Sequence, residues 1–482
     1  MLADMTIELV VKHAGKQYEV ELDESSTGKD FKLKMEELTG VPPERQKILV
    51  KGGQIKDDGL VADLQLPPKT VLMMLGVATA LPKYTPKVLG PALPIKLAEQ
   101  TPNGIQNIGN TCYANSCLQA LNALPDVKDA LVNYSGSSQL IKMAGQLFKD
   151  LESKTVSPIL FMLTLRNVFP QFNEQDRSTG MHKQQDAEEL WTQLNDLFRQ
   201  SEVVTNGTGT DKKIPLAKYF EGIFEEKTTN SEIDTEPSVE RAESFNKLSC
   251  HITISTNFLR DGLLAGLKED LVKFSEPLNR DAHYSVERKI VRLPKYLTVQ
   301  MVRFFWRRDT REKSKILRKV VFPFTLDVSQ MCTEDLRSKL VPARDAYHTM
   351  ENEFEEARRQ AKRQKLSSLA QKQDKIEDTL PVEKQKELKQ AVMSKIAPEF
   401  VDDPTVNPLG IYELRAVITH RGQSADSGHY ICFVRNPKKP ESWWCFNDEK
   451  VHEVDQAKIE SLAGGGESDS ALILLYSTPD ME

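Results

Sequence analysis

The first 75 residues alternate between hydrophobic and polar positions in a pattern that predicts a small α+β domain. Residues 7–11 and 18–22 each carry an apolar side chain at every second position, which is the period of a half-buried strand. Apolar residues recur at helical spacing in the charged segment 31–38, and residues 71–75 form a last hydrophobic run. This pattern predicts two strands, then a helix, then a further strand.

The segment between that helix and the last strand contains the phrase QKILVKGGQIKDD at residues 46–58. With the order strand, strand, helix, strand, strand, this phrase resembles ubiquitin-like domains, which implies a β-grasp fold over residues 5–77. Leu49 falls where ubiquitin carries the isoleucine of its hydrophobic patch. The chain runs on through Gly76 and Val77, so we expect a fixed docking module that is not itself conjugated. A different small α+β domain is the alternative.

A second, larger region begins at Gly104, after a proline-rich segment. Residues 78–103 hold five prolines and one glycine, a composition that opposes helices and central strands and predicts an extended linker. Helical spacing recurs in residues 113–132, 141–151 and 184–200. The predicted strands are 249–256, 286–293, 296–304, 411–434 and 443–477. The polar segments predicted to be surface loops are 201–213 and 228–246.

A highly charged segment interrupts this region. Between residues 344 and 390, 21 of 47 residues are charged and glycine is absent, which favours a helical hairpin or a coiled extension. A break is expected near Pro381, because proline removes a helical hydrogen bond. The predicted helical insertion spans residues 344–397, and a solvated insertion without function is the alternative.

The overall composition fits a soluble globular protein. Of the 482 residues, 39% are hydrophobic and 28% are charged, and the formal net charge is −6. This balance argues against a general nucleic-acid binder, which would carry a basic surplus. No apolar run approaches the roughly 18 residues that a membrane span needs, and the N-terminal stretch does not resemble a signal peptide. We therefore expect no nucleic-acid or membrane partner and a cytoplasmic and nuclear location.

The cysteines are sparse, and no two of them form a C-x-x-C pair. Such pairs are typical of zinc sites, and dense cysteines are typical of disulfide frameworks. We therefore expect free thiols, a reducing compartment, and no metal or other cofactor. The six cysteines are Cys112, Cys117, Cys250, Cys332, Cys432 and Cys445.

Cys112 stands where a loop rich in glycine and asparagine, residues 104–111, meets an amphipathic helix. The free amides at a helix start favour an anion, so they should lower the pKa of this thiol and could hold a developing oxyanion. A lone cysteine at a helix start is more often structural, so the interpretation depends on residues elsewhere in the chain.

Two later segments supply those residues. Residues 421–428 form a polar loop, bracketed by glycines, that leads to His429 at the start of a strand, and histidine moves protons readily near neutral pH. On the next predicted strand, Asn447 or Asp448 could lie beside the imidazole and orient it. A nucleophile followed far downstream by its base and orienting residue is typical of Cys-His-Asn/Asp proteases.

Together these segments resemble the ubiquitin-specific protease family over residues 104–477. The loop GIQNIGNTCYANSCLQ matches the cysteine box, YELRAVITHRGQSADSGHY matches the histidine box, and LPKYLTVQMVRF and LILLY match core strands. The resemblance implies a papain-like α+β catalytic domain over residues 104–478, built as fingers, palm and thumb. With the ubiquitin-like unit in front, the chain resembles the proteasome-associated branch of that family.

The resemblance also implies roles for single residues. Cys112 would be the nucleophile, His429 the base and Asn447 the third member of the triad, with Asp448 as the neighbouring candidate. Asn107 matches the amide of the oxyanion hole. The box that shapes the cleft and contacts ubiquitin is matched by Gln184, Gln185 and Asp186.

The implied activity is a cysteine isopeptidase that cleaves after the C-terminal glycine of ubiquitin. It would act on ubiquitin conjugates at the proteasome and dock on the 26S regulatory particle through residues 5–77. Two alternatives stay open. One is a catalytically silent scaffold that binds ubiquitin at the proteasome, and the other is a deconjugase of a different ubiquitin-like modifier.

The remaining expectations concern the fingers and the cleft. Many family members bind zinc in the fingers through two C-x-x-C pairs, but only Cys250 falls in that region, so no structural zinc is expected. Loops 305–315 and 421–428 are expected to gate the cleft, although a basic nucleic-acid patch at residues 304–308 is an alternative. The core is expected to contain Cys117 and at least one of Trp443 and Trp444.

Overall fold

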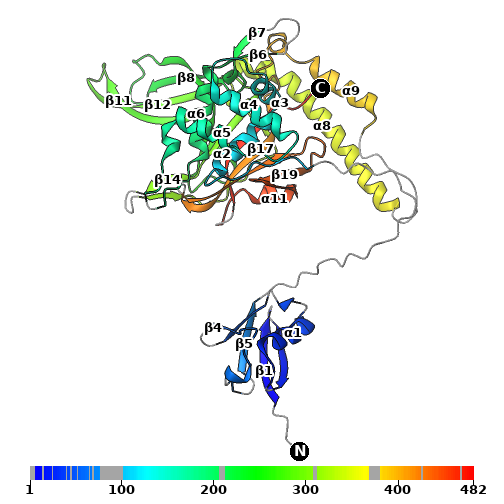
Figure 1. Ribbon diagram of the computed structural model, residues 1–482. Coiled ribbons are helices and arrows are strands. Elements are labelled where there is room, and N and C mark those ends of the chain that lie inside the picture. Colours follow the sequence, from blue (N-terminus) through cyan, green and yellow to red (C-terminus); the bar gives the residue numbers. More distant parts are fainter. Residues whose placement is uncertain are drawn as a thin grey trace, which may run out of the picture. The chain divides into compact units, whose positions relative to one another are not determined.

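The computed structural model divides the chain into two compact units, Met1–Ala98 and Glu99–Glu482 (Figure 1). The described residues run from 6 to 481 apart from 14–15, 24, 40, 44–45, 51–52, 65, 68–69, 76–100, 178, 206–211, 308–311, 369–379, 425–426 and 467–468. Most of the predicted linker, 78–103, therefore lies outside the described residues, as do the tips of loops 305–315 and 421–428. In the described part of the chain, no helix is both long and apolar enough to cross a membrane.

The N-terminal unit packs one helix against a five-stranded mixed sheet. The strand order is β2-β1-β5-β3-β4, and β1 and β5 run parallel. Phe31 and Met35 of α1 are fully buried in the core, because residues four apart share one helix face. Leu33 and Leu38, part of the predicted apolar stripe, are instead 44% and 45% exposed. The elements are β1 (Thr6–His13), β2 (Lys16–Asp23), α1 (Gly28–Thr39), β3 (Lys47–Val50), β4 (Gly53–Gln54), η2 (Ala62–Leu64) and β5 (Thr70–Leu75).

The second unit is built around an eight-stranded sheet. Its strand order is β10-β13-β21-β17-β18-β19-β20, and β16 pairs with β17. The predicted strand 249–256 ends early, at His251, and the predicted run 443–477 is interrupted by α11 (Gln456–Ser461). The strands are β10 (Leu248–His251), β13 (Tyr296–Val302), β16 (Thr325–Asp327), β17 (Ile411–Ser424), β18 (Ser427–Arg435), β19 (Ser442–Asn447), β20 (Lys450–Asp455) and β21 (Ser470–Ser477).

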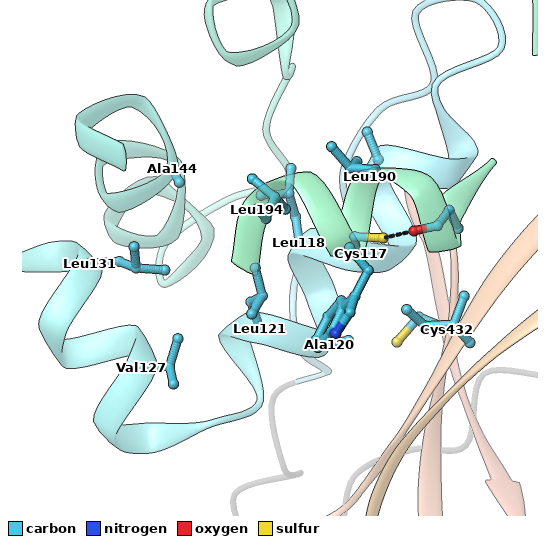
Figure 2. Packing of buried hydrophobic residues seen from close by; sticks show 14 of the residues in the cluster. Cys117, Leu118, Ala120, Leu121, Val127, Leu131, Ala144, Leu190, Leu194 and Cys432 are labelled. Carbon is cyan, nitrogen blue, oxygen red and sulfur yellow. Dashed lines mark hydrogen bonds between the residues drawn. The ribbon is translucent and has the colours of Figure 1, made fainter. Parts of the chain in front are cut away.

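Both faces of this sheet are buried, in two separate hydrophobic cores. On β18, Cys432 belongs to the core formed with the helices α2 to α6, whereas Phe433 belongs to the core on the other face. Figure 2 shows Cys117 in the first core, where its thiol contacts the carbonyl oxygen of Ala187 at 3.3 Å. Cys117 is therefore a core thiol, as predicted. The helices are α2 (Cys112–Asn122), α3 (Pro125–Val132), α4 (Gln139–Leu151), α5 (Ile159–Val168) and α6 (Ala187–Arg199).

A four-stranded sheet, here called the fingers sheet, projects from the rest of this unit (Figure 1). Its order is β11-β12-β8-β9. The predicted surface loop 228–246 is therefore wrong for the part that forms β9, which pairs with β8. Strand β9 is exposed at nearly every position, so it lacks the apolar alternation that marks a strand in sequence. The strands are β8 (Gly222–Asn230), β9 (Val239–Phe245), β11 (Lys268–Ser275) and β12 (Arg280–Arg292).

The second predicted loop and the charged insertion also contain regular structure. The polar segment 201–213 includes β6 (Glu202–Thr205) and the start of β7 (Lys212–Pro215), which pair with each other. The charged segment forms α8 (Glu334–Ser368) and α9 (Val382–Met393), which share a small core through Tyr347 and Val392. Helix α8 begins at Glu334 rather than near residue 344, and it accommodates Pro342 internally. The remaining helices are α7 (Leu259–Gly266) and α10 (Pro398–Val401).

Candidate active site

Cys112 is the first residue of α2, at the junction that the sequence predicts. Its side chain is 2% exposed, and its Sγ accepts hydrogen bonds from Gln184 Nε2 at 3.2 Å and from the backbone nitrogen of Tyr430 at 3.5 Å. Both partners are donors that hold the sulfur in place. The sequence does not predict this contact from Gln184, because the resemblance implies only that its box shapes the cleft and contacts ubiquitin.

His429, near the start of β18, and Asn447, at the end of β19, meet as predicted. Their Nε2 and Oδ1 atoms are 2.6 Å apart. Because the amide oxygen only accepts, Nε2 carries the hydrogen and the other ring nitrogen is left to face Cys112. The pKa of His429 is raised to about 9, first by its hydrogen bond with the Cys112 side chain and further by Asn447 and the charge of Asp448, while burial opposes the shift.

Asp448 lies behind this pair and joins it to the loop before Cys112. Its Oδ2 accepts from Asn107 Nδ2 at 3.0 Å and lies 3.9 Å from His429 Nε2, and its Oδ1 accepts from Asn115 Nδ2 at 2.8 Å. The backbone of Asp448 has a φ of 54°, which few residues other than glycine, asparagine and aspartate adopt readily. The residue thus turns the chain after β19 and directs its carboxylate toward α2.

Asn107, the predicted oxyanion residue, is fixed at both ends of its amide. Its Oδ1 accepts from the backbone nitrogens of Gly109 and Thr111 at 3.0 and 3.3 Å, and its Nδ2 donates to Asp448. An amide nitrogen carries two hydrogens, so one is used by Asp448 and the second can serve a substrate oxygen. Gly109 has a φ of 108°, so glycine suits this tight loop.

Gln184, the first residue of the box at residues 184–186, donates to the Cys112 sulfur, and Gln185 is half-buried. Asp186 caps α6, because its Oδ1 accepts from the backbone nitrogen of Glu188 at 2.9 Å. Asp186 therefore has a structural role, whereas the predicted contact of these residues with ubiquitin stays a prediction.

Two hairpins carry the loops predicted to gate the cleft. The segment 305–315 forms β14 (Phe304–Arg307) and β15 (Glu312–Lys315), and the segment 421–428 lies largely within the β17–β18 hairpin. The first hairpin is anchored at its base, where Lys315 Nζ donates to the carbonyl oxygen of His420 at 2.5 Å. Burial lowers the pKa of Lys315 to about 8. The contact with His420 joins the base of the first hairpin to β17, the first strand of the second.

The structure also places the cysteines and the paired tryptophans of the predicted core. All six cysteines are free and buried. Among the residues that the structure describes, no three histidine, cysteine, aspartate or glutamate side chains come together as a metal site would require. Trp443 is fully buried, which confirms that at least one of the paired tryptophans is core.

Comparisons with known proteins agree with this architecture. A family model described as Ubiquitin carboxyl-terminal hydrolase matches residues 103–476, and a model described as Ubiquitin family matches residues 9–77. These matches confirm the predicted α+β combination of an N-terminal ubiquitin-like domain and a ubiquitin-specific protease domain.

Several relatives match almost the entire chain. Ubiquitin carboxyl-terminal hydrolase 6 of Schizosaccharomyces pombe is 40% identical over 99% of this chain and 100% of its own length. Ubiquitin carboxyl-terminal hydrolase 6 of Arabidopsis thaliana is 37% identical over 95% of both chains. Ubiquitin carboxyl-terminal hydrolase 14 of Caenorhabditis elegans is 33% identical over 97% of this chain and 92% of its own. The chain belongs to the ubiquitin carboxyl-terminal hydrolase family of cysteine deubiquitinases.

Proposed function

We propose that this deubiquitinase acts on ubiquitin conjugates held at the proteasome and releases ubiquitin for reuse, with Cys112, His429 and Asn447 as its triad. The observation that carries the triad is the 2.6 Å contact between His429 and Asn447 in a site that also holds the Cys112 sulfur. The three residues come from the start of α2, the start of β18 and the end of β19. Such convergence is what nucleophilic catalysis by a thiolate requires.

The proposed reaction proceeds in two steps. The Cys112 thiolate attacks the carbonyl carbon of the C-terminal glycine of ubiquitin, and the resulting oxyanion is held by the Asn107 amide and backbone N–H groups. The C–N bond then breaks, the lysine amine leaves with a proton from His429, and a thioester forms on Cys112. Next, His429 takes a proton from water, the hydroxide displaces the thiol, and ubiquitin leaves with a free carboxylate.

The ubiquitin-like domain supports the proteasomal part of the proposal. Leu49 pairs with Met73 across β3 and β5, so the two side chains share one face of the sheet, and Val71 and Leu75 alternate onto that face. These four apolar side chains are between 39% and 54% exposed. An exposed apolar face on a small domain suits docking to a larger particle. We propose that residues 5–77 dock on the 26S regulatory particle, in the cytoplasm and the nucleus.

The hairpins β14–β15 and β17–β18 suggest how docking could raise activity. We propose that the loops 305–315 and 421–428 keep the activity of the isolated chain low and that proteasome binding relieves this restriction. If about 1% of isolated molecules are in the open form, the partner must bind the open form roughly 3 kcal/mol more tightly than the closed form. The two forms are then equally populated. Tethering through the first domain would favour this step by raising the effective concentration of the partner.

The chemistry is tested with ubiquitin fused to a fluorophore. Wild-type protein should release the fluorophore, and Cys112→Ala should abolish release while ubiquitin binding persists. A ubiquitin vinylsulfone probe should label the wild type at Cys112, and labelling at Cys117 would contradict the assignment. A chain that binds ubiquitin without cleaving it would be the silent scaffold, and one that cleaves only other modifiers would be a different deconjugase.

The docking proposal has its own test. Full-length protein and a variant lacking residues 1–77 are titrated with proteasomes whose own hydrolase activity is blocked. Both proteins should show similar basal hydrolysis, because the triad lies outside the deleted unit. Only the full-length protein should be stimulated strongly at subsaturating proteasome. Equal stimulation of both would remove the docking role from the first domain.

A further inference from the structure

Asn115 is a buried polar residue that the proposed mechanism does not use. It lies one helical turn after Cys112 on α2 and is 2% exposed. Its Nδ2 atom is 2.8 Å from Asp448 Oδ1, 3.2 Å from the carbonyl oxygen of Gln106 and 3.4 Å from that of Ile105. All three neighbours are acceptors, so this position is satisfied only by a side chain that presents a hydrogen-bond donor.

The carboxylate that Asn115 holds is connected to the reacting groups. Asp448 directly follows Asn447, whose Oδ1 is 2.6 Å from His429 Nε2. The second oxygen of Asp448 accepts from Asn107 and lies 3.9 Å from the same His429 nitrogen. A rotation of this carboxylate would therefore move or release the Asn107 amide and change the field at His429.

The backbone holds this turn in place without help from Asn115. The backbone nitrogen of Ile105 donates to the carbonyl oxygen of Asp448 at 3.1 Å. A Cβ atom at Gly104 would lie 2.5 Å from that oxygen, so the two chain segments are in direct contact. The backbone contacts fix the position of the turn but not the orientation of the Asp448 carboxylate. The Asn115 amide sets that orientation.

We infer that Asn115 is a positioning residue: it anchors Asp448 to the helix that carries Cys112, and so keeps the His429–Asn447 pair and the Asn107 amide aligned with the nucleophile. The inference rests on the proposed catalytic roles of those residues. Asn115 then acts on catalysis through Asp448 and does not contact the substrate itself.

Two substitutions at this position test the inference by steady-state hydrolysis of an isopeptide-linked ubiquitin substrate. Asn115→Leu keeps a similar shape but removes the donor, and it should lower kcat about 10- to 100-fold, because small displacements of reacting groups cost that much. KM should stay within about twofold, since the ubiquitin-binding surface is untouched. Asn115→Asp should be worse, because it places a carboxylate among three oxygen atoms.

A pH profile and a double variant separate positioning from simple folding effects. Since Asn447 and Asp448 help to raise the pKa of His429, the alkaline limb of kcat/KM should move to lower pH in Asn115→Leu. Adding Asp448→Asn to Asn115→Asp removes the repulsion and supplies a donor, so the double variant should be more active than Asn115→Asp alone. Asn122→Leu, at the other end of α2, is the control and should keep wild-type kcat.

The outcomes distinguish this inference from the proposed function. Rates are expressed per active site titrated with ubiquitin vinylsulfone, so that unfolded molecules do not count. Failure of the wild type to cleave, or activity in Cys112→Ala, would contradict the proposed function. If wild type cleaves but Asn115→Leu keeps its kcat and its pH profile per active site, Asn115 has no positioning role.

Discussion

The candidate active site and the fingers sheet each bury a carboxylate, but they hold it with different partners. In the candidate active site, the Asp448 side chain is 9% exposed and accepts hydrogen bonds from the amides of Asn107 and Asn115. These donors are neutral, so they orient the carboxylate without cancelling its charge. The charge stays available to His429, whose imidazolium form it stabilises.

In the fingers sheet, a buried carboxylate is instead neutralised. Glu226 of β8 is 1% exposed and pairs with Arg241 of β9 at 2.6 Å and with Arg288 of β12 at 2.8 Å. A second carboxylate, Glu236, accepts from Tyr284 at 2.8 Å and from Ser275, also at 2.8 Å. The Glu226 pairs link β8 to β9 and β12 through side chains, in addition to the backbone ladders.

The difference shows that burial alone does not reveal what a charged side chain does. A carboxylate matched by arginines connects strands and contributes to the stability of the fold. A carboxylate held by amides keeps its charge and can act on a neighbouring group. Substitutions in the two regions should therefore separate activity from stability.

The largest effect is expected at His429. His429→Ala should lower kcat/KM by several orders of magnitude, because the proposed reaction loses the group that moves the proton. The melting temperature should change far less than the activity, since the ring is partly exposed. Hydrolysis and thermal unfolding are measured together, with His348→Ala on α8 as an exposed control. Retention of more than about a tenth of wild-type activity would exclude His429 as the base.

The next largest effect is expected at Glu226, and on stability rather than chemistry. Glu226→Gln leaves two arginines without their buried partner, which should lower the free energy of unfolding by about 2 kcal/mol. The estimate lies below the range for a fully buried pair because Arg241 is 66% exposed and can be hydrated. Denaturant unfolding measures the change, and kcat should be retained.

A matched control lies on the same pair of strands. Glu240 pairs with Lys227 at 3.2 Å, and both side chains are more than half exposed. Glu240→Gln should therefore change stability by less than about 1 kcal/mol. Equal losses for Glu226→Gln and Glu240→Gln would mean that the buried pair contributes no more than a surface pair.

The sequence predicts the residues of the candidate active site from their motifs, but not the hydrogen bonds that join them. Cys112, His429 and Asn447 each stand at a local signal, namely a helix start, a strand after a glycine-bracketed loop, and the following strand. The bond between Asn115 and Asp448 joins residues 333 positions apart, and no local pattern marks it. Its one available hint was that Asn115 follows Cys112 by three residues and so lies near it on the helix.

The fold was predictable where one face of an element is apolar. The alternation in residues 7–11 and 18–22 predicted β1 and β2, whose inner side chains are buried. Strand β9 was missed because it is exposed on both faces and its place in the fingers sheet depends on partners in β8 and on ion pairs. Pairing of that kind is set by tertiary contacts, not by local periodicity.

A smaller and more specific effect is expected in the pH dependence of cleavage. The pKa of His429 is raised to about 9, so the imidazolium is present at neutral pH and is lost as the pH rises through about 9. The contribution of His429 to the free energy of unfolding depends on pH in the same direction. It is fully present below about pH 6.5, the pKa of histidine in the unfolded chain, and is lost as the pH rises through about 9. The kcat/KM for an isopeptide-linked substrate should therefore fall near pH 9. Asn447→Ala should shift that limb to lower pH, and a wild-type limb near pH 6.5 would contradict a pKa of His429 that Cys112, Asn447 and Asp448 raise.

The smallest effect is expected from removal of metal ions, and it tests what holds the fingers together. Cys250 lies on β10 of the eight-stranded sheet and is fully buried, and the sequence has no C-x-x-C pair of the kind that binds zinc in the fingers of many family members. The arginine pairs of Glu226 already join β8, β9 and β12. A chelator should therefore leave both the melting temperature and the hydrolysis rate unchanged, whereas a zinc-containing member of the same family should lose stability under the same treatment. Stoichiometric zinc in the purified protein, measured by elemental analysis, would show that a metal stabilises the fingers sheet together with these ion pairs.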